Sequence, residues 1–308
     1  MSPIAAKLRT IISDPGRIRP DEPLHSYTTF RIGGPADWLV EVTSGEELAG
    51  LLQLAKEESL PVHVLGNGSN LLVSDTGVRG FVIILAGEFN RYELTGQTLR
   101  AGGGYNLPKL ANRIAKLGLG GLEFACAIPG TVGAGLVINA GAHGGELKDV
   151  VSETTVVWLD GRKEVLPVDR IGLRYRSSDL QGAGAIVTEV VMQLRTAVQE
   201  ELMAHMKAHL ERRRQTQPLN LPNAGSVFMN PPGDFAGRLI EQAGLKGLTV
   251  GGAQVSEKHA NFVVNLGNAT AKDVLLLMDR VRAEVDARFG VRLQPEVKIW
   301  GDNPYFIF

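Results

Sequence analysis

The chain has 308 residues, 44% of them hydrophobic and 21% charged, with a formal net charge of −1 and one cysteine, Cys126. This length favours two or three domains, the near-neutral charge disfavours nucleic-acid or membrane partners, and a lone cysteine excludes an intramolecular disulfide. No apolar run approaches the ~20 residues that span a bilayer. We expect no secretion signal, because residues 1–7 lack a charged segment followed by an apolar core. We therefore expect a cytoplasmic protein and favour a monomer.

The first part of the chain, residues 1–90, has the pattern of a small α/β lobe. Residues 1–25 predict a short helix and then an irregular segment. Ser44 and Glu47 have the spacing of a helix capping box, and the apolar residues behind them share one helical face, namely Leu48, Leu51, Leu52 and Ala55. Strands are expected at 62–65, 71–73 and 81–85. Residues 298–308 are a candidate to return to this lobe.

Residues 91–198 predict a second lobe built mainly of strands. A helix is expected near 107–117, ended by Gly118, and a glycine-rich segment follows at 128–145. Strands are expected at 154–159, 164–166 and 185–191. The Asp160–Gly161 pair between the first two is a strong hairpin signal.

Residues 199–308 predict a third, C-terminal domain with two long helices. The first, at 200–214, would turn four apolar side chains inward, namely Leu202, Met203, Met206 and Leu210. The second begins at a capping box formed by Thr270 and Asp273 and ends at Gly290. Its apolar stripe comprises Val274, Leu277, Met278, Val281, Val285 and Phe289.

Three glycine-rich segments, at 31–35, 66–70 and 128–145, are candidates to bring the main chain against a ligand. Successive backbone N–H groups in such turns form anion-binding nests, for which a pyrophosphate is a natural guest. Close packing of the chain against itself is the alternative for each segment taken alone. A strand rather than a helix is expected after 66–70, which excludes the Rossmann dinucleotide fingerprint there.

Six motifs, in their order along the chain, resemble the UDP-N-acetylenolpyruvoylglucosamine reductase (MurB) family. They are Thr29–Ala36, Gly66–Asn70, Ile128–Gly133, Tyr175–Ser178, Ala224–Phe228 and Leu293–Val297. The resemblance implies an α+β protein, in which a two-lobed FAD-binding fold of the vanillyl-alcohol-oxidase type precedes a C-terminal substrate-binding domain. Between Arg176 and Ser226 there is little room for the tyrosine-bearing loop of one branch of the family, so the chain is similar to the shorter second branch (type II).

The function that this resemblance implies is a reduction in peptidoglycan precursor synthesis. In that family NADPH reduces FAD, and the enolpyruvyl ether of a UDP-sugar is then reduced to give UDP-N-acetylmuramate. We therefore expect non-covalent FAD, NADPH, a sugar-nucleotide substrate and no metal. An enolate forms during such a reaction, so the protein must stabilise negative charge and deliver one proton.

The resemblance assigns these tasks to three residues. Ser226 matches the proton donor, and Arg176 matches the residue that pairs with the enolate, for which a permanently charged, planar guanidinium is suited. Glu296 matches the third catalytic residue, either as part of a hydrogen-bond network or protonated on the substrate carboxyl group. Taken singly, each has an ordinary alternative: Ser226 as a turn former, Arg176 and Glu296 as surface charges.

The resemblance also implies which residues bind the ligands. The expected FAD contacts are Ile32, Gly33, Gly34, Gly66, Asn67, Gly68, Ser69, Asn70, Ile128, Pro129, Gly130, Thr131, Gly133, Asn139, Ala140 and Gly141. The expected substrate contacts are Tyr175, Gly225, Asn230, Lys246 and His259. A polar run is a candidate contact of the diphosphate or of NADPH, and it comprises Lys246, Gln254, Lys258, His259 and Asn261. A structural role is an equal alternative for His259.

Two other functions stay open from the sequence. Another FAD-dependent oxidase or dehydrogenase of the same fold, acting on an alcohol or a sugar, explains the glycines but not the joint match of Arg176, Ser226 and Glu296. A non-catalytic flavin-binding module would tolerate the loss of Ser226 or Glu296, and both are present.

Overall fold

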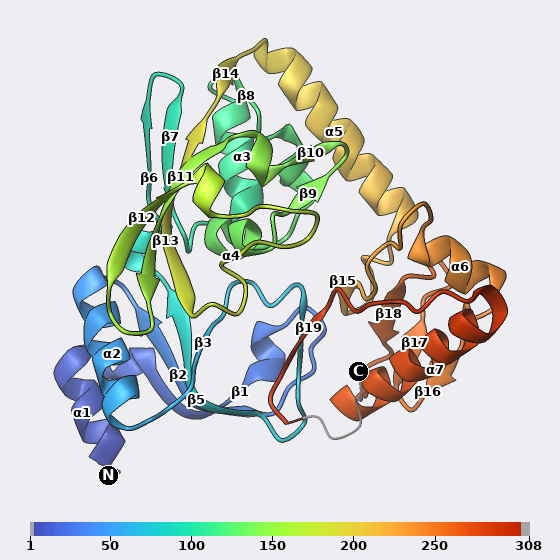
Figure 1. Cartoon of the computed structure of the whole chain (residues 1–308), viewed down its shortest axis with the longest axis horizontal. Coiled ribbons are helices and arrows are strands. Elements are labelled where there is room, and N and C mark those ends of the chain that lie inside the picture. Colours follow the sequence, from blue (N-terminus) through green and yellow to red (C-terminus); the bar gives the residue numbers. More distant parts are fainter. Residues whose placement is uncertain (1–2, 303–308) are drawn as a thin grey trace. The chain divides into compact units, whose positions relative to one another are not determined.

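The computed structural model describes residues 3–302, and the chain divides into two compact units. The first unit comprises three segments, the chain up to Pro20, Trp38–Gly66 and Gly80–Arg212. The second unit comprises Asp21–Asp37, Asn67–Arg79 and the chain from Arg213. Figure 1 labels the helices and strands in chain order. The division of the chain at residues 90 and 198 stays a prediction.

A four-stranded sheet in the order β1-β2-β5-β3 forms the start of the chain. Its strands are β1 (Ile18–Pro23), β2 (Pro35–Val42), β5 (Val78–Leu85) and β3 (Val62–Val64), and β3 runs parallel to β5. Helices α1 (Pro3–Ile11) and α2 (Gly45–Glu57) pack against each other. The predicted strands at 62–65 and 81–85 are thus confirmed, whereas a strand rather than an irregular segment occupies 18–23.

Helix α2 begins as predicted, but Glu47 does not close the capping box. The Ser44 hydroxyl accepts a hydrogen bond from the Glu47 amide at 3.2 Å. The Glu47 carboxylate instead accepts hydrogen bonds from the Thr43 amide and, at 2.7 Å on each oxygen, from both terminal nitrogens of Arg17. The bidentate Arg17 guanidinium is the stronger partner, because both groups are charged.

This ion pair makes stability depend on pH. Hydrogen bonds from Arg17, and then from Thr43, lower the pKa of Glu47 from 4.5 to about 2 although burial opposes them. A carboxyl group with a depressed pKa stabilises the fold fully above its unfolded pKa, and this contribution is lost as the pH falls through the folded pKa. We expect Glu47→Gln to lower the free energy of unfolding by about 2 kcal/mol at pH 7.

The measurement is urea unfolding at a series of pH values. The difference between Glu47→Gln and the unchanged protein should shrink between about pH 4.5 and about pH 2. Glu46→Gln is the matched control, since Glu46 is exposed on the same first turn. A difference that stays constant over this range would contradict the assignment.

The second part of the first unit is a five-stranded antiparallel sheet in the order β12-β11-β13-β7-β6. The strands are β6 (Tyr92–Thr95), β7 (Thr98–Gly102), β11 (Val151–Trp158), β12 (Lys163–Pro167) and β13 (Ala185–Gln193). The hairpin predicted at Asp160–Gly161 joins β11 to β12. Two short antiparallel pairs accompany the sheet: β8 (Leu119–Gly120) with β14 (Arg195–Thr196), and β9 (Gly141–Ala142) with β10 (Gly145–Glu146).

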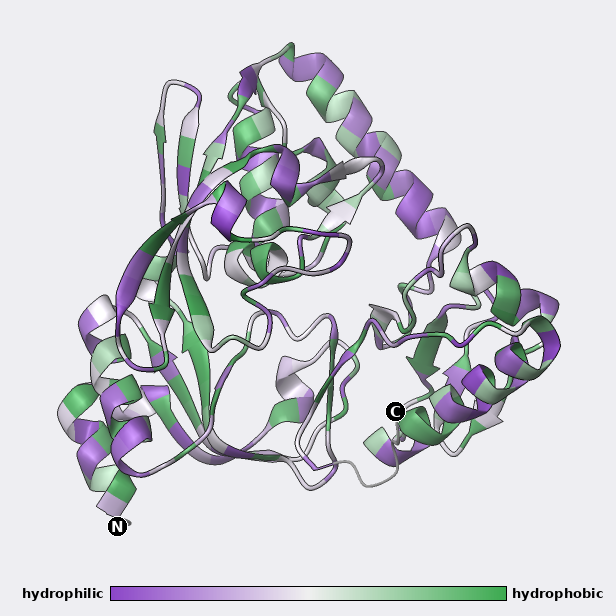
Figure 2. Cartoon of the chain, viewed as in Figure 1, coloured by the Kyte–Doolittle hydropathy of each residue, from purple (hydrophilic) through white to green (hydrophobic). Residues whose placement is uncertain are grey.

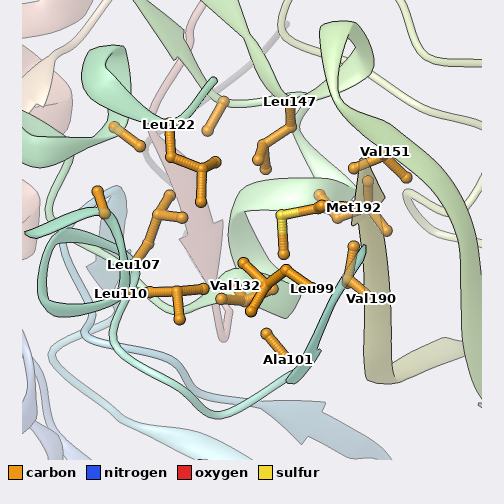
Figure 3. Packing of buried hydrophobic residues seen from close by; sticks show 14 of the residues in the cluster. Leu99, Ala101, Leu107, Leu110, Leu122, Val132, Leu147, Val151, Val190 and Met192 are labelled. Atoms are coloured by element: carbon orange, nitrogen blue, oxygen red, sulfur yellow. The ribbon is translucent and has the colours of Figure 1, made fainter. Parts of the chain in front are cut away.

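Helices α3 (Leu107–Ala115) and α4 (Val132–Val137) share one hydrophobic core with this sheet. Figure 3 shows Leu107 and Leu110 of α3 and Val132 of α4 packed with side chains of β7 and β13, among them Leu99 and Met192. The predicted end of α3 at Gly118 is close but late: the last helical residue is Ala115, and Gly118 completes the turn after it with a φ of 71°.

The second unit contains the sheet β15-β18-β17-β16 and two helices. The strands are β15 (Asn223–Ser226), β16 (Thr249–Val250), β17 (Ala253–Val255) and β18 (Phe262–Asn265), and the helices are α6 (Ala236–Gln242) and α7 (Ala271–Phe289). The capping box of Thr270 and Asp273 and the left-handed Gly290 bound α7 as predicted. Phe289, the last member of the predicted stripe, is 37% exposed, because the packed face ends one turn earlier.

One further strand pair ties distant parts of the chain together within the second unit. Strand β19 (Lys298–Trp300) runs parallel to β4 (Leu71–Val73). The Asp75 carboxylate accepts hydrogen bonds from the amides of Ala271 and Lys272, at 2.8 and 3.1 Å. The segment 67–79 is therefore part of the same folded body as α7.

Helix α5 (Gln199–Thr216) is largely hydrophilic, as Figure 2 shows. Leu202 and Met206 are each 2% exposed, but Leu210 is 39% exposed. The prediction of an inward Leu210 is wrong, because only the first half of the helix packs on a hydrophobic core. No helix within residues 3–302 is long and apolar enough to cross a membrane. Short 3₁₀ turns complete the elements at 15–17, 24–27, 87–90, 123–127, 147–149 and 168–170.

Candidate functional site

Ser226 and Glu296 lie on adjacent stretches of main chain in the second unit. The chain continues from β15 into an antiparallel bridge between Phe228 and Pro295. The Glu296 amide donates a hydrogen bond to the Val227 carbonyl at 2.9 Å, so the residue after Ser226 is bonded to Glu296 itself. The structure thus brings two of the three predicted catalytic residues into one neighbourhood, although 70 positions separate them in the sequence.

The Ser226 hydroxyl is available to a ligand. Its side chain is half-buried, and among residues 3–302 no group hydrogen-bonds to the hydroxyl oxygen. Gly225 beside it has a φ of 76°, and a Cβ added there would meet nothing within 4 Å. Glycine relieves the strain of that conformation, and the space beside it leaves room for a ligand to approach Ser226.

The segment 67–70 lies next to these residues and presents unused amides. The Asn70 side-chain nitrogen donates to the Glu296 carbonyl at 3.2 Å, and the Asn70 carbonyl accepts from Lys298. The amides of Asn67, Gly68 and Asn70 donate to no group in the described part of the chain. A turn with several free amides is a nest for an anion such as a phosphate.

The segment Ile32–Gly34 is used by the fold itself. The Gly33 and Gly34 carbonyls accept hydrogen bonds from the amides of His25 and Leu24, and the Gly34 amide donates to Ser74. A Cβ on Gly34 would lie 2.3 Å from the Asp75 carbonyl oxygen. These glycines are explained by close packing, the alternative that the sequence left open, and their contact with a cofactor stays a prediction.

The first unit holds Arg176 at the tip of a tight turn. Arg174 and Ser177 exchange backbone hydrogen bonds, which leaves Tyr175 and Arg176 as the turn residues. Arg176 has a φ of 53°, an uncommon conformation for a residue with a side chain. Its guanidinium donates to the Gly141 carbonyl at 2.9 Å and lies 5.5 Å from the centre of the Tyr175 ring.

The predicted cofactor residues 139–141 support this turn. Asn139 is 1% exposed. Its side-chain nitrogen donates to the Arg174 carbonyl at 3.1 Å and to Glu146 at 2.6 Å, and its oxygen accepts from the Lys148 amide. The Asn139 side chain is fully used by these bonds, so its structural effect is to fix the turn that carries Arg176.

The segment 128–133 offers a second set of free amides, within the first unit. Thr131 caps α4, and a Cβ on Gly66 would lie 3.0 Å from the Thr131 hydroxyl, so 66 and 131 are neighbours. The amides of Gly130 and Thr131 donate to nothing among residues 3–302. A Cβ on Gly130 would enter open space, and Pro129 next to it is exposed.

These features fit a flavin dinucleotide. A pyrophosphate needs unused backbone donors, which 67–70 and 130–131 each supply, and a flat ring system needs accessible main chain without bulky side chains, which Pro129 and Gly130 supply. The residues present in both segments are therefore compatible with FAD.

Three predicted substrate residues lie around α6, two near its start and one near its end. The Asn230 side-chain oxygen accepts from the Ala236 amide at 3.1 Å. A Cβ on Gly237 would lie 3.3 Å from the His259 ring. Lys246 pairs with Glu241 at 2.6 Å and lies near enough to His259 to disfavour its protonation.

His259 is a neutral histidine with one nitrogen in use. Burial, and then the charge of Lys246, lowers its pKa below the usual value of 6.5. Its Nδ1 accepts a hydrogen bond from the Asn261 amide at 3.2 Å, which places the ring proton on Nε2. His259 therefore has a structural bond on one side of its ring and a donor on the other.

Several residues that position the site were not distinguished by the sequence. Asn261, which the polar run suggested as a diphosphate or NADPH contact, is 3% exposed, and its amide group bonds both the N–H and the carbonyl of Phe228. It holds the strand of Ser226, a role that the sequence did not distinguish. The Thr29 hydroxyl donates to the Asn223 carbonyl at 2.7 Å. In the sequence, only the position of Thr29 inside a motif pointed to its importance. The contact itself could not be predicted, because it joins residues far apart in the chain.

A separate cavity of about 440 Å³ in the first unit contains none of the predicted site residues. His143 and His209 stack on its border with ring centres 4.0 Å apart, and Arg195 pairs with Glu123 at 2.7 Å. Burial, and then the neighbouring His205, lowers the pKa of His209. No group of three or more potential metal ligands is found in the part of the chain from residue 3 to 302.

Comparison with sequence families gives two matches. The profile described as UDP-N-acetylenolpyruvoylglucosamine reductase, C-terminal domain, matches residues 217–300. A profile described as FAD binding domain matches residues 36–166. The FAD-binding match falls in the N-terminal part of the chain and the reductase match in the C-terminal part, in agreement with the predicted fold class.

Individual proteins match over almost the whole chain. UDP-N-acetylenolpyruvoylglucosamine reductase 2 of Symbiobacterium thermophilum is 67% identical over 306 residues, 99% of each chain. UDP-N-acetylenolpyruvoylglucosamine reductase of Heliobacterium modesticaldum is 48% identical, over 94% of this chain and 92% of its own. The crystal structure of MurB from Thermus caldophilus has a TM-score of 0.81 and 42% identity, and covers 92% of this chain and 100% of that one. The predicted α+β class, an FAD-binding fold with a further C-terminal α+β domain, is confirmed.

Proposed function

Because the chain belongs to the UDP-N-acetylenolpyruvoylglucosamine reductase family, we propose that it reduces UDP-N-acetylenolpyruvoylglucosamine to UDP-N-acetylmuramate with FAD and NADPH. The observation that carries the proposal is the accessible hydroxyl of Ser226 on a strand whose next residue is bonded to Glu296. A non-catalytic flavin-binding module would have no need of this arrangement. We place the reaction in the cytoplasm and assign it to a monomer.

We propose that residues 1–90 and 91–198 hold FAD, and that residues 199–308 bind the substrate. Either the amides of Asn67, Gly68 and Asn70 in the second unit or those of Gly130 and Thr131 in the first unit would receive the pyrophosphate. When bound, FAD would supply the hydride that the vinyl carbon gains, with NADPH as the source of that hydride. The protein contributes position and electrostatic field to that chemistry.

Three side chains would complete the reaction. Arg176 would stabilise the negative charge of the enolate, since a planar guanidinium presents several N–H donors to an oxyanion. Ser226 would donate the proton that the enolate carbon gains, and the hydroxyl is suited to this because no described group competes for it. Glu296 would orient the neighbouring hydrogen-bond network or, when protonated, the substrate carboxyl group.

The test is anaerobic stopped-flow absorbance of the purified holoenzyme. NADPH should bleach the visible flavin band, and UDP-N-acetylenolpyruvoylglucosamine should restore it rapidly. UDP-N-acetylglucosamine, which lacks the enolpyruvyl group, is the matched control and should restore nothing. Recovery only on admission of oxygen would favour an oxidase of the same fold, and a colourless protein would overturn the proposal.

A further inference from the structure

Phe235 is the most exposed of the large hydrophobic side chains in the described part of the chain, at 66%. It belongs to none of the hydrophobic cores. An aromatic side chain that the fold leaves in water has hydrophobic area and a ring face free for a partner. Phe235 stands just before α6, in the second unit.

The main chain around Phe235 is held in place on both sides. The Phe235 amide donates to the Asp234 carboxylate at 2.6 Å, and its carbonyl accepts from Leu239 at 3.2 Å. The Asp234 carboxylate in turn forms an ion pair with Arg238. Pro231 and Pro232 restrict the preceding turn. An exposed aromatic residue on a fixed backbone binds a flat partner with little loss of conformational freedom.

The neighbours of Phe235 are the residues predicted to bind the substrate. Asn230 bonds the amide of the residue that follows Phe235, and the His259 ring lies against Gly237, two positions further on. The charges close by cancel in pairs, Asp234 with Arg238 and Glu241 with Lys246. Paired charges around an exposed ring favour stacking of an uncharged aromatic ring on Phe235.

We propose that Phe235 is the residue on which the uracil ring of the UDP-sugar stacks, so that it determines substrate affinity without taking part in the chemistry. This assignment rests on the proposed function, because that function supplies a nucleotide substrate. Base–aromatic stacking tolerates any flat ring, so affinity for the uridine part should depend on the ring of Phe235.

The experiment measures the binding of UDP to the oxidised holoenzyme by calorimetry, which needs no turnover. Phe235→Ala should bind UDP about tenfold more weakly, the loss typical of one base–aromatic stack. Phe235→Tyr should restore the affinity, since it keeps the ring. Phe289→Ala is the matched control, because Phe289 is an exposed phenylalanine of the same unit at the far end of α7, and its affinity for UDP should be unchanged.

The kinetic readout separates this proposal from the proposed function. Phe235→Ala should raise KM for the UDP-sugar about tenfold with kcat unchanged, the pattern of lost ground-state binding. Unchanged UDP affinity in Phe235→Ala would overturn the inference. A variant that bound only 2′,5′-ADP more weakly would also overturn it, because Phe235 would then contact NADPH instead of the UDP-sugar. A third contrary outcome is that Phe235 forms a dimer contact. Phe235→Ala would then sediment more slowly than the unchanged protein while its affinity for UDP stayed the same. Failure of the proposed function would be visible in the unchanged protein as an absence of flavin reoxidation by the UDP-sugar.

Discussion

Ser226→Ala is expected to slow reduction of the UDP-sugar by about 10²–10⁴-fold, the usual contribution of a general acid. The reduction of FAD by NADPH should stay close to its original rate, because that half-reaction needs no proton from Ser226. The variant should fold normally: the hydroxyl bonds to nothing within residues 3–302, and alanine keeps the Cβ. Single-turnover stopped flow, with the two half-reactions measured separately, gives both rates.

Thr249→Ala is the control for Ser226→Ala, since Thr249 is an exposed hydroxyl residue of the same unit, on β16. It should leave both half-reactions unchanged. Equal losses in the two half-reactions of Ser226→Ala would contradict a proton-donor role, because such a pattern indicates a general disturbance of the cofactor site.

Arg176→Ala is expected to lower the rate of UDP-sugar reduction by about 10²–10³-fold, as for removal of one group that stabilises an oxyanion. The substitution removes the guanidinium and its bond to the Gly141 carbonyl. It leaves the turn itself in place, since the Arg174–Ser177 backbone bonds and the Asn139 bond to Arg174 do not involve the side chain of Arg176. FAD content, measured by absorbance after gel filtration, should be unchanged.

Arg174→Ala is the matched control for Arg176→Ala. It removes the same charge from the same turn, but Arg174 is paired with Asp179 at 2.6 Å and its side chain is 59% exposed. Its effect on either half-reaction should be small, as for other surface ion pairs. If Arg176→Ala lost FAD and kept its substrate rate per bound flavin, the enolate assignment would be wrong.

The elements that could be predicted are those with local signals. The hairpin at Asp160–Gly161 and the bounds of α7 follow from turn and cap residues a few positions apart, and these predictions are confirmed. The capping box predicted at the start of α2 is wrong for Glu47, because Arg17, 30 residues away, binds the Glu47 carboxylate. Leu210 was misplaced because the helical period says which residues share a face, not how far a neighbouring core extends.

In the candidate site, too, local motifs could be recognised in the sequence and long-range contacts could not. Its motifs were recognisable one by one, and their roles stay predictions. What joins them could not be found in the sequence: the Thr29 bond to Asn223 and the Asn70 bond to Glu296 each connect residues about 200 positions apart. Asn139 illustrates the limit most clearly, since nothing nearby in the chain shows that its side chain holds the carbonyl of Arg174.

The parallel pairing of β4 with β19 also sets an order for synthesis. Leu71 leaves the ribosome 227 residues before Lys298, its partner in the register. At about 5–20 residues per second, β4 waits roughly 10–45 s for that strand. During this interval its backbone donors and acceptors have no partner from β19, and an unpaired strand edge is a template for association with other chains. Until Lys298–Trp300 has been translated, Leu71–Val73 is therefore an edge at which the nascent chain is open to association.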